Sequence, residues 1–206
     1  MSEEHTLLIQ ARTGDTFAFD QLHLMVAPAI TRFVRRLVGD GQHVEDIVQD
    51  VFLTLFKNLE AIDPPEKLRP YLFRVARHRC YDLLRKQGRY NIVSLDDEPV
   101  HVRVSFTSQR HTPPDEAAHW LLLQMEVQEA IDRLPEHQRQ TLILYSEAEL
   151  SYAEIADVMD VSIGTVKSRL FHAKKNLRGL LHPETLLAIM QELGDQSTEP
   201  EIIKSP

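Results

Sequence analysis

The spacing of apolar residues is the feature that most limits the fold of this chain, because nearly every periodic stretch has the period of an α-helix. In residues 69–86 one apolar stripe consists of Leu72, Val75, Ala76, Leu83 and Leu84. Another, in residues 44–59, consists of Ile47, Val48, Val51, Phe52, Leu55, Phe56 and Leu59. Only seven of the 206 residues are glycines, and stretches with strand-like alternation are hard to find. The sequence predicts an all-α fold.

Two interruptions divide the helical stretches. Paired prolines in residues 62–70 (IDPPEKLRP) disfavour helix and predict a loop. Residues 88–114 have no helical period and include the polar, proline-containing run QRHTPPDE, which is typical of a linker. We therefore expect two small helical domains joined by a flexible linker, with an N-terminal domain at 1–90, the linker at 91–117, a C-terminal domain at 118–182, and a tail at 183–206 that forms a short helix and then disorder.

Residues 151–175 (SYAEIADVMDVSIGTVKSRLFHAKK) carry the strongest motif. Ser151 and Glu154 match a capping box, which predicts a short helix that begins there and ends near Met159. After a tight break, a second helix is expected over about 163–181. Two helices in this arrangement form a helix-turn-helix, whose second helix enters the major groove of DNA. The residues expected to hold the two helices together are Ile155, Val158, Val161, Val166 and Leu170.

The opposite face of the second helix has the side chains that a DNA reader needs. Lysine and serine can donate hydrogen bonds to base edges or phosphates, and a phenylalanine can contact a thymine methyl group. The residues that recur on this face are Lys167, Ser168, Phe171, His172 and Lys175. The alternative is an amphipathic helix whose polar face is simply solvated.

The charge is strongly segregated along the chain, although the net charge is −8. Residues 69–90 have a net charge of +6 and residues 161–178 a net charge of +5. By contrast, residues 119–160 have a net charge of −7 and residues 40–60 a net charge of −4. This distribution suits a protein that contacts phosphates at two places and something basic elsewhere.

The first basic block is expected to be a helix with cations and an aromatic ring on one side. Such a surface can hold a phosphate backbone and stack an unpaired base, as single-strand binders do. A solvated basic face is the alternative. The residues concerned are Arg74, Arg77, His78, Tyr81 and Arg85, next to the loop residues Lys67 and Arg69.

Asp46, Gln49 and Asp50 share the polar face of the helix expected over 44–59. Acids spaced by three and four positions offer a docking face for a basic partner helix, although they could also be ordinary solubilising charge.

Other classes of protein lack support in the sequence. There is no glycine-rich phosphate loop, HExxH pair or nucleophile elbow, so we expect no enzyme, no cofactor and no catalytic residue. The single cysteine, Cys80, is interpreted as a small core residue, and no metal site is expected. No apolar run is long enough for a membrane helix and the start MSEEH does not resemble a signal peptide, so we expect a cytoplasmic protein with no membrane insertion.

Four segments together resemble regions 2 and 4 of the sigma-70 family: VEDIVQDVFLTLFKNL (44–59), RPYLFRVARHRCYDLLRKQGR (69–89), LPEHQRQTLIL (134–144) and SYAEIADVMDVSIGTVKSRLFHAKKNLRGLL (151–181). A chain with only these two regions is similar to the extracytoplasmic-function (ECF) group of bacterial RNA polymerase sigma factors. Where the family commonly has glycine in the turn, this chain has Asp160, which tolerates a left-handed backbone better than most residues.

The resemblance implies three sites. It implies that the acidic helix binds the coiled coil of the polymerase beta-prime subunit through Asp46, Gln49 and Asp50. It implies that the loop at 62–70 and the basic helix recognise and melt the minus-10 element through Lys67, Arg69, Arg74, Arg77, His78, Tyr81 and Arg85. It implies that the minus-35 element is read by Thr165, Lys167, Ser168, Arg169, Phe171, His172 and Lys175.

The resemblance also implies partners. These are the RNA polymerase core, with the beta flap as a further contact, promoter DNA, and an anti-sigma factor. The alternative function is a stand-alone helix-turn-helix regulator that does not bind core polymerase, but this leaves the acidic and basic helices of residues 44–86 unexplained.

Overall fold

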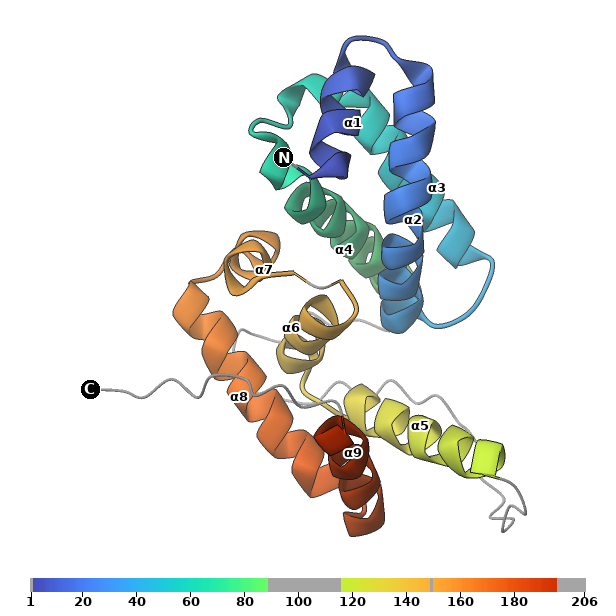
Figure 1. Cartoon of the computed structure of the whole chain (residues 1–206), viewed down its shortest axis with the longest axis vertical. Helices are drawn as coiled ribbons and strands as arrows, with labels where there is room; N and C mark the ends of the chain where they lie inside the picture. The colour runs from blue at the N-terminus through green and yellow to red at the C-terminus, as the bar shows by residue number, and fades with distance from the viewer. Residues whose placement is uncertain (1, 89–115, 149, 196–206) are drawn as a thin grey trace. The chain divides into compact units, whose positions relative to one another are not determined.

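The structure is a computed structural model that describes residues 2–88, 116–148 and 150–195. Within these ranges it contains nine α-helices, two short 3-10 helices and no strand, which confirms the predicted all-α fold (Figure 1). No helix in the described ranges is both long and apolar enough to cross a membrane. Most of the predicted linker, residues 91–117, lies outside them.

The chain divides into two compact units, each built from two separate stretches. The first unit combines Met1–Val100 with Pro135–His172, and the second combines His101–Leu134 with Ala173–Pro206. Residues 135–172, which include most of the helix-turn-helix motif, therefore belong to the same unit as the N-terminal helices.

Four α-helices form the N-terminal part of the first unit. Their bounds are Glu3–Arg12 for α1, Thr16–Val38 for α2, His43–Lys57 for α3 and Leu68–Lys86 for α4. The ends of α2 have local causes, since Asp15 Oδ1 accepts from Ala18 N at 3.1 Å and Gly39 ends the helix at φ 84°. The predicted helices at 44–59 and 69–86 correspond to α3 and α4.

The predicted stripe of α4 is only partly in the core, because Leu72, Ala76 and Leu84 are buried whereas Val75 and Leu83 are partly exposed. Phe33 of α2 and Phe73 of α4 are fully buried, and their rings meet edge to face with centroids 5.2 Å apart. Cys80 is also fully buried, which agrees with its interpretation as a core residue. One member of the predicted stripe of α3 differs, because Phe56 is exposed and lies at the edge of a groove beside α2.

The loop between α3 and α4 contains two 3-10 helices, η1 (Leu59–Ala61) and η2 (Pro65–Lys67). Arg12 of α1 donates from Nε to the Leu59 carbonyl oxygen at 3.0 Å, which attaches this loop to the first helix. The loop predicted from the paired prolines is therefore present and held against the bundle.

The rest of the first unit contains α6 (Glu136–Ser146), α7 (Tyr152–Met159) and the first part of α8 (Ile163–Leu180). The capping box at Ser151 and Glu154 is present as predicted. Asp160 ends α7 in the left-handed conformation at φ 54°, and the Val161 amide donates to the Ala156 carbonyl oxygen at 3.0 Å. Together, α7, this turn and α8 form the expected helix-turn-helix.

The second unit contains α5 (Glu116–Asp132), the end of α8 and α9 (Pro183–Asp195). The short helix predicted in the tail is α9. Glu126 of α5 caps its start, because its carboxylate accepts from the His182 amide at 2.6 Å and from the Thr185 hydroxyl at 2.5 Å.

Candidate nucleic-acid interface

The exposed face of α8 carries the residues predicted to read duplex DNA. Lys167, Ser168, His172 and Lys175 are exposed, and Phe171 is 66% exposed. Phe171 and His172 meet edge to face with ring centroids 5.4 Å apart. Contact with a thymine methyl group would remove the exposed Phe171 ring from water.

The opposite side of α8 is attached to α7 by buried apolar residues. Ile155 and Val158 of α7 and Val166 and Leu170 of α8 are buried, while Val161 in the turn is partly exposed. The start of α8 is capped by Ser162, whose Oγ accepts from the Thr165 amide at 3.1 Å. This packing leaves Lys167, Ser168 and Lys175 exposed on the opposite side of α8.

Two members of the predicted minus-35 set are less accessible than the others. Thr165 and Arg169 are partly exposed. The pKa of Arg169 lies below its usual value, chiefly because of burial and then because of the nearby cation Arg77. Arg169 is therefore close to the basic helix α4 of the same unit.

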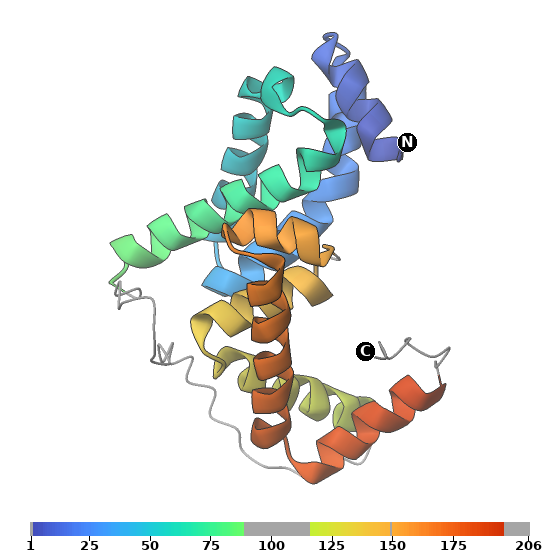
Figure 2. The ribbon, with the colours of Figure 1, turned by 90° about the vertical axis from the view of Figure 1, so that its left-hand side faces the viewer.

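Two of the basic residues of α4 contact other helices of the same unit. Arg74 donates from Nη2 to Asp157 of α7, at 2.6 Å to the carbonyl oxygen and 2.7 Å to Oδ1. Arg77 donates from Nε to Oε1 of Gln140 in α6 at 2.9 Å. Figure 2 shows α7 lying against α4, and the contacts confirm that these two helices are neighbours.

Tyr81 is part of the same contact. Its hydroxyl donates to Oε1 of Glu136 and accepts from Nε2 of Gln140, and its side chain is only 5% exposed. The Arg77 guanidinium lies 5.1 Å from the centroid of the Tyr81 ring, within the range of a cation–π interaction. In this arrangement the ring is not available to stack on a base, although the sequence predicted that role.

The remaining members of the predicted minus-10 set vary. Lys67, His78 and Arg85 are exposed, and Arg85 pairs with Asp82 at 3.1 Å within α4. Arg69 donates to Glu4 of α1 at 2.7 Å and to the Ala148 carbonyl oxygen at 3.4 Å. Lys67, His78 and Arg85 are therefore exposed to solvent, whereas the other members of the set contact distant parts of the chain.

The predicted core-polymerase residues lie together on α3 and are exposed. They are Asp46, Gln49 and Asp50, and Asp50 also pairs loosely with Arg79 of α4 at 3.8 Å. The structure thus brings these three residues onto one accessible face.

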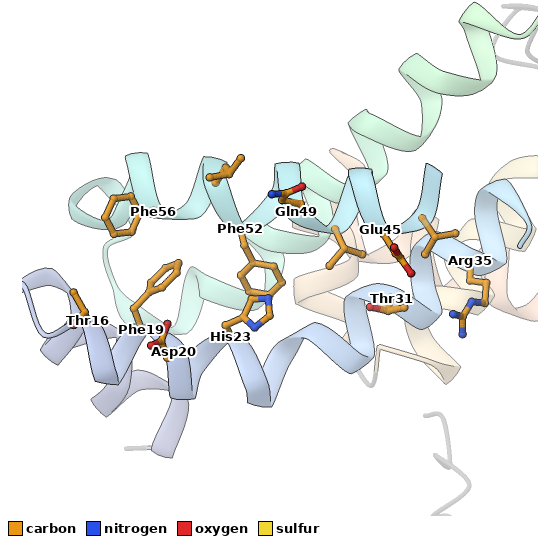
Figure 3. Close-up of a pocket in the computed structure, with 13 residues that line it drawn as sticks. Thr16, Phe19, Asp20, His23, Thr31, Arg35, Glu45, Gln49, Phe52 and Phe56 are labelled. Carbon is orange, nitrogen blue, oxygen red and sulfur yellow. The ribbon is translucent and has the colours of Figure 1, made fainter. Parts of the chain in front are cut away.

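A groove of about 600 Å³ runs between α2 and α3 beside this face (Figure 3). Its wall includes two ring pairs, Phe19 with Phe56 at 5.3 Å and His23 with Phe52 at 4.3 Å between centroids. The acids Asp20 and Glu45 also line the groove. An apolar groove with acids along it suits an amphipathic helix that carries basic residues.

Sequence reasoning missed the residues that contact the basic helix. Glu136 and Gln140 of α6 and Asp157 of α7 were not assigned a role, and neither was Glu147, which pairs with Arg36 of α2 at 3.1 Å. The available signal was the acidic block at 119–160, interpreted as facing something basic. Part of what it faces is the chain's own arginines.

Two histidines near these cations predict a pH-dependent stability. The pKa of His137 lies below its usual value near 6.5 because of burial, then Arg169 of α8 and Arg77 of α4, against a smaller opposite effect of Glu136. The pKa of His78 is also lowered, first by burial and then by Arg77. As the pH falls, the unfolded chain takes up these protons before the folded chain does. We therefore expect the free energy of unfolding to be highest above pH 6.5 and to decrease as the pH drops below that value.

Urea unfolding followed by circular dichroism between pH 7.5 and 5.5 measures this effect. His137→Gln, which cannot take up a proton, should have a shallower loss of stability than the wild type. If the variant loses stability as steeply, His137 does not contribute.

Sequence comparison relates this arrangement to known proteins. Residues 22–90 match Sigma-70 region 2, and residues 124–177 match Sigma-70, region 4. The chain is 30% identical over 190 residues to the ECF RNA polymerase sigma-E factor of Escherichia coli strain K12, a match that covers 89% of this chain and 98% of that protein. The chain is an ECF sigma factor of the sigma-70 family.

Two further relatives agree with this membership. The ECF RNA polymerase sigma factor SigE of Mycolicibacterium smegmatis is 28% identical over 172 residues, which is 82% of this sigma factor and 65% of that relative. The sigma factor RpoE of Bartonella quintana, crystallised with the anti-sigma factor NepR, has a similar fold with a TM-score of 0.57 and 27% identity. That match covers 79% of this sigma factor and 95% of the solved chain.

Proposed function

We propose that this ECF sigma factor directs core RNA polymerase to its promoters through three surfaces of one chain. The α3 face binds the beta-prime coiled coil, α8 reads the minus-35 duplex, and the 62–70 loop with α4 recognises and melts the minus-10 element. In this proposal the region 2 domain is 1–90, the linker 91–117, the region 4 domain 118–182 and the tail 183–206. A contact between the polymerase beta flap and the region 4 domain completes the assembly.

The observation that carries the proposal is the face of α8. It combines cations, a serine and an exposed phenylalanine on the second helix of a helix-turn-helix, which is the element that enters a major groove. The acidic face of α3 supports docking of the basic partner, because both its charge and the neighbouring apolar groove suit such a helix.

An anti-sigma factor is the proposed regulatory partner. The relative from Bartonella quintana was crystallised with one, which supports a similar partner here. The anti-sigma factor could be identified by purifying this sigma factor from its native cells under mild conditions and identifying the protein that co-purifies with it.

In vitro transcription tests the proposal directly. Purified core polymerase is supplied with this chain and a library of genomic promoter fragments, and the transcript starts are sequenced. We expect initiation at a set of sites that share two spaced elements. If the folded chain adds no initiation above core alone, the proposal is wrong.

Replacing Lys167 with alanine should weaken use of the minus-35 element. Lys167 is exposed on the DNA-facing side of α8, and loss of a base contact costs about 1–3 kcal/mol, or roughly 5- to 150-fold. Transcription from promoters with intact and scrambled minus-35 elements measures the effect. The difference between the two promoters should be smaller for the variant than for the wild type, and an unchanged preference would rule out base reading by Lys167.

A further inference from the structure

An exposed leucine in the middle of α2 lies beside a hollow on the same face of that helix. Leu24 is 64% exposed, although α2 is 23 residues long and buries its other side against the bundle. The following two turns carry smaller side chains, and a shallow depression of about 420 Å³ is lined there by Ala27, Pro28 and Thr31 together with Leu24. This face therefore combines an apolar projection with a hollow of small residues.

The same face has opposite charges at its two ends. Asp20 lies one turn before Leu24, Arg35 lies one turn after Thr31, and both charged residues are exposed (Figure 3). Arg35 already pairs with Asp40 at 2.9 Å, but both side chains are solvent-exposed, and ion pairs of this kind contribute little to stability. The Arg35 guanidinium can therefore pair with a different acid at little cost.

This order of features is complementary to itself when two copies of α2 pack antiparallel. In a two-fold interface every contact occurs twice, because residue i meets residue j and j meets i. With the two-fold axis midway along the face, Asp20 of one copy lies opposite Arg35 of the other. Leu24 then lies opposite Thr31, where the hollow can receive it, as a side chain of one helix fits between those of another.

We propose that this face of α2 is an interface between two copies of the chain. The residues that define the α2 face are Asp20, Leu24, Ala27, Pro28, Thr31 and Arg35. The partner is a second copy rather than an unrelated helix, because the reversed face matches both the shape and the charge order of the original.

The association is expected to be weak. One pair of helices buries little surface compared with a stable dimer, so we expect a Kd of about 10–100 µM. The net charge of −8 on each copy opposes association, and salt at about 0.15 M screens this repulsion.

Sedimentation velocity of the full chain measures whether it self-associates. Between about 5 and 200 µM, the weight-average mass should rise from 23.8 kDa towards twice that value. A chain that stays at 23.8 kDa over the whole range would overturn the proposal.

A charge exchange tests which residues meet. Asp20→Arg alone and Arg35→Glu alone should each weaken self-association about tenfold or more, because each places like charges at both ends of the interface. A mixture of the two variants should associate within about threefold of the wild type, because opposite charges then face each other at both ends. If the mixture associates no more tightly than either variant alone, the proposal is overturned.

A matched control separates this pairing from a general effect of net charge. Glu60→Arg makes the same charge change as Asp20→Arg at an exposed residue of η1. Mixed with Arg35→Glu, it should associate about tenfold more weakly than Asp20→Arg does, because one end of the interface still has like charges. Equal association of the two mixtures would contradict the proposal. Circular dichroism checks that each variant is folded.

Disulfide cross-linking tests the geometry at the middle of the face. Ala27→Cys places the thiols of two copies next to each other across the two-fold axis, so mild oxidation should join them. Ala29→Cys makes the same substitution two residues later, on another side of α2, and should not be joined. Cys80 does not compete, because it is 0% exposed. Failure of Ala27→Cys to cross-link, or equal cross-linking of both variants, would rule out this interface.

Discussion

Asp50→Lys is expected to weaken binding of core polymerase by about 100-fold. Asp50 is exposed on the α3 face with Asp46 and Gln49, and a lysine there would place like charges against a basic partner helix. Such a juxtaposition costs several kcal/mol, and about 3 kcal/mol corresponds to the stated factor. Affinity for purified core, measured by fluorescence anisotropy of the labelled sigma factor, checks the effect.

The fold should survive this change. Asp50 has only a loose pair with Arg79 at 3.8 Å, and exposed pairs of this kind contribute at most about 1 kcal/mol. Glu60→Lys is a matched control, because it makes the same charge change at an exposed residue of η1. If Asp50→Lys and Glu60→Lys bind core equally well, the α3 face is not the docking site.

Phe73→Ala is expected to lower the free energy of unfolding by about 3–5 kcal/mol. The Phe73 side chain is fully buried, and its edge-to-face contact with Phe33 at 5.2 Å would also be lost. Small domains are stable by only about 5–15 kcal/mol, so the change removes a large share of the total. With a slope of about 2 kcal/mol per M, the urea midpoint should fall by about 2 M.

Phe17→Ala provides the control for this experiment. It makes the same substitution in α2, but Phe17 is 69% exposed, so the expected change is within about 0.5 kcal/mol. A similar loss of stability in both variants would show that Phe73 is not a principal core contact.

Local signals explain why much of the fold could be predicted. The apolar periods of residues 44–59 and 69–86 predicted α3 and α4, and the capping box at Ser151 predicted the start of α7. Asp160 was expected to accept a left-handed backbone, and it does so at φ 54°. Each of these features depends on residues that lie close together in the sequence and within one helix or its end, so the sequence contains the whole cause.

Burial was less predictable than helix position. Phe56 has the right spacing for the apolar face of α3, yet it is exposed, because it lies at the edge of the groove beside α2. Tyr81 was placed on a DNA-facing surface, yet it is buried because α6 supplies Glu136 and Gln140 against it. Helical spacing says which side of a helix a residue occupies, but not which other element covers that side.

The sequence by itself determined the helices, the helix-turn-helix, the two basic blocks and the family. Only the tertiary structure decided that Arg74 would meet Asp157, a residue 83 positions away, and that Arg77 and Tyr81 would meet α6. The sequence does not identify which acid will pair with a given arginine, because any acid that packing brings near the guanidinium group can form the ion pair. The basic helix was therefore predictable as a chemical surface, whereas the part of the chain that covers it follows from the way distant helices pack.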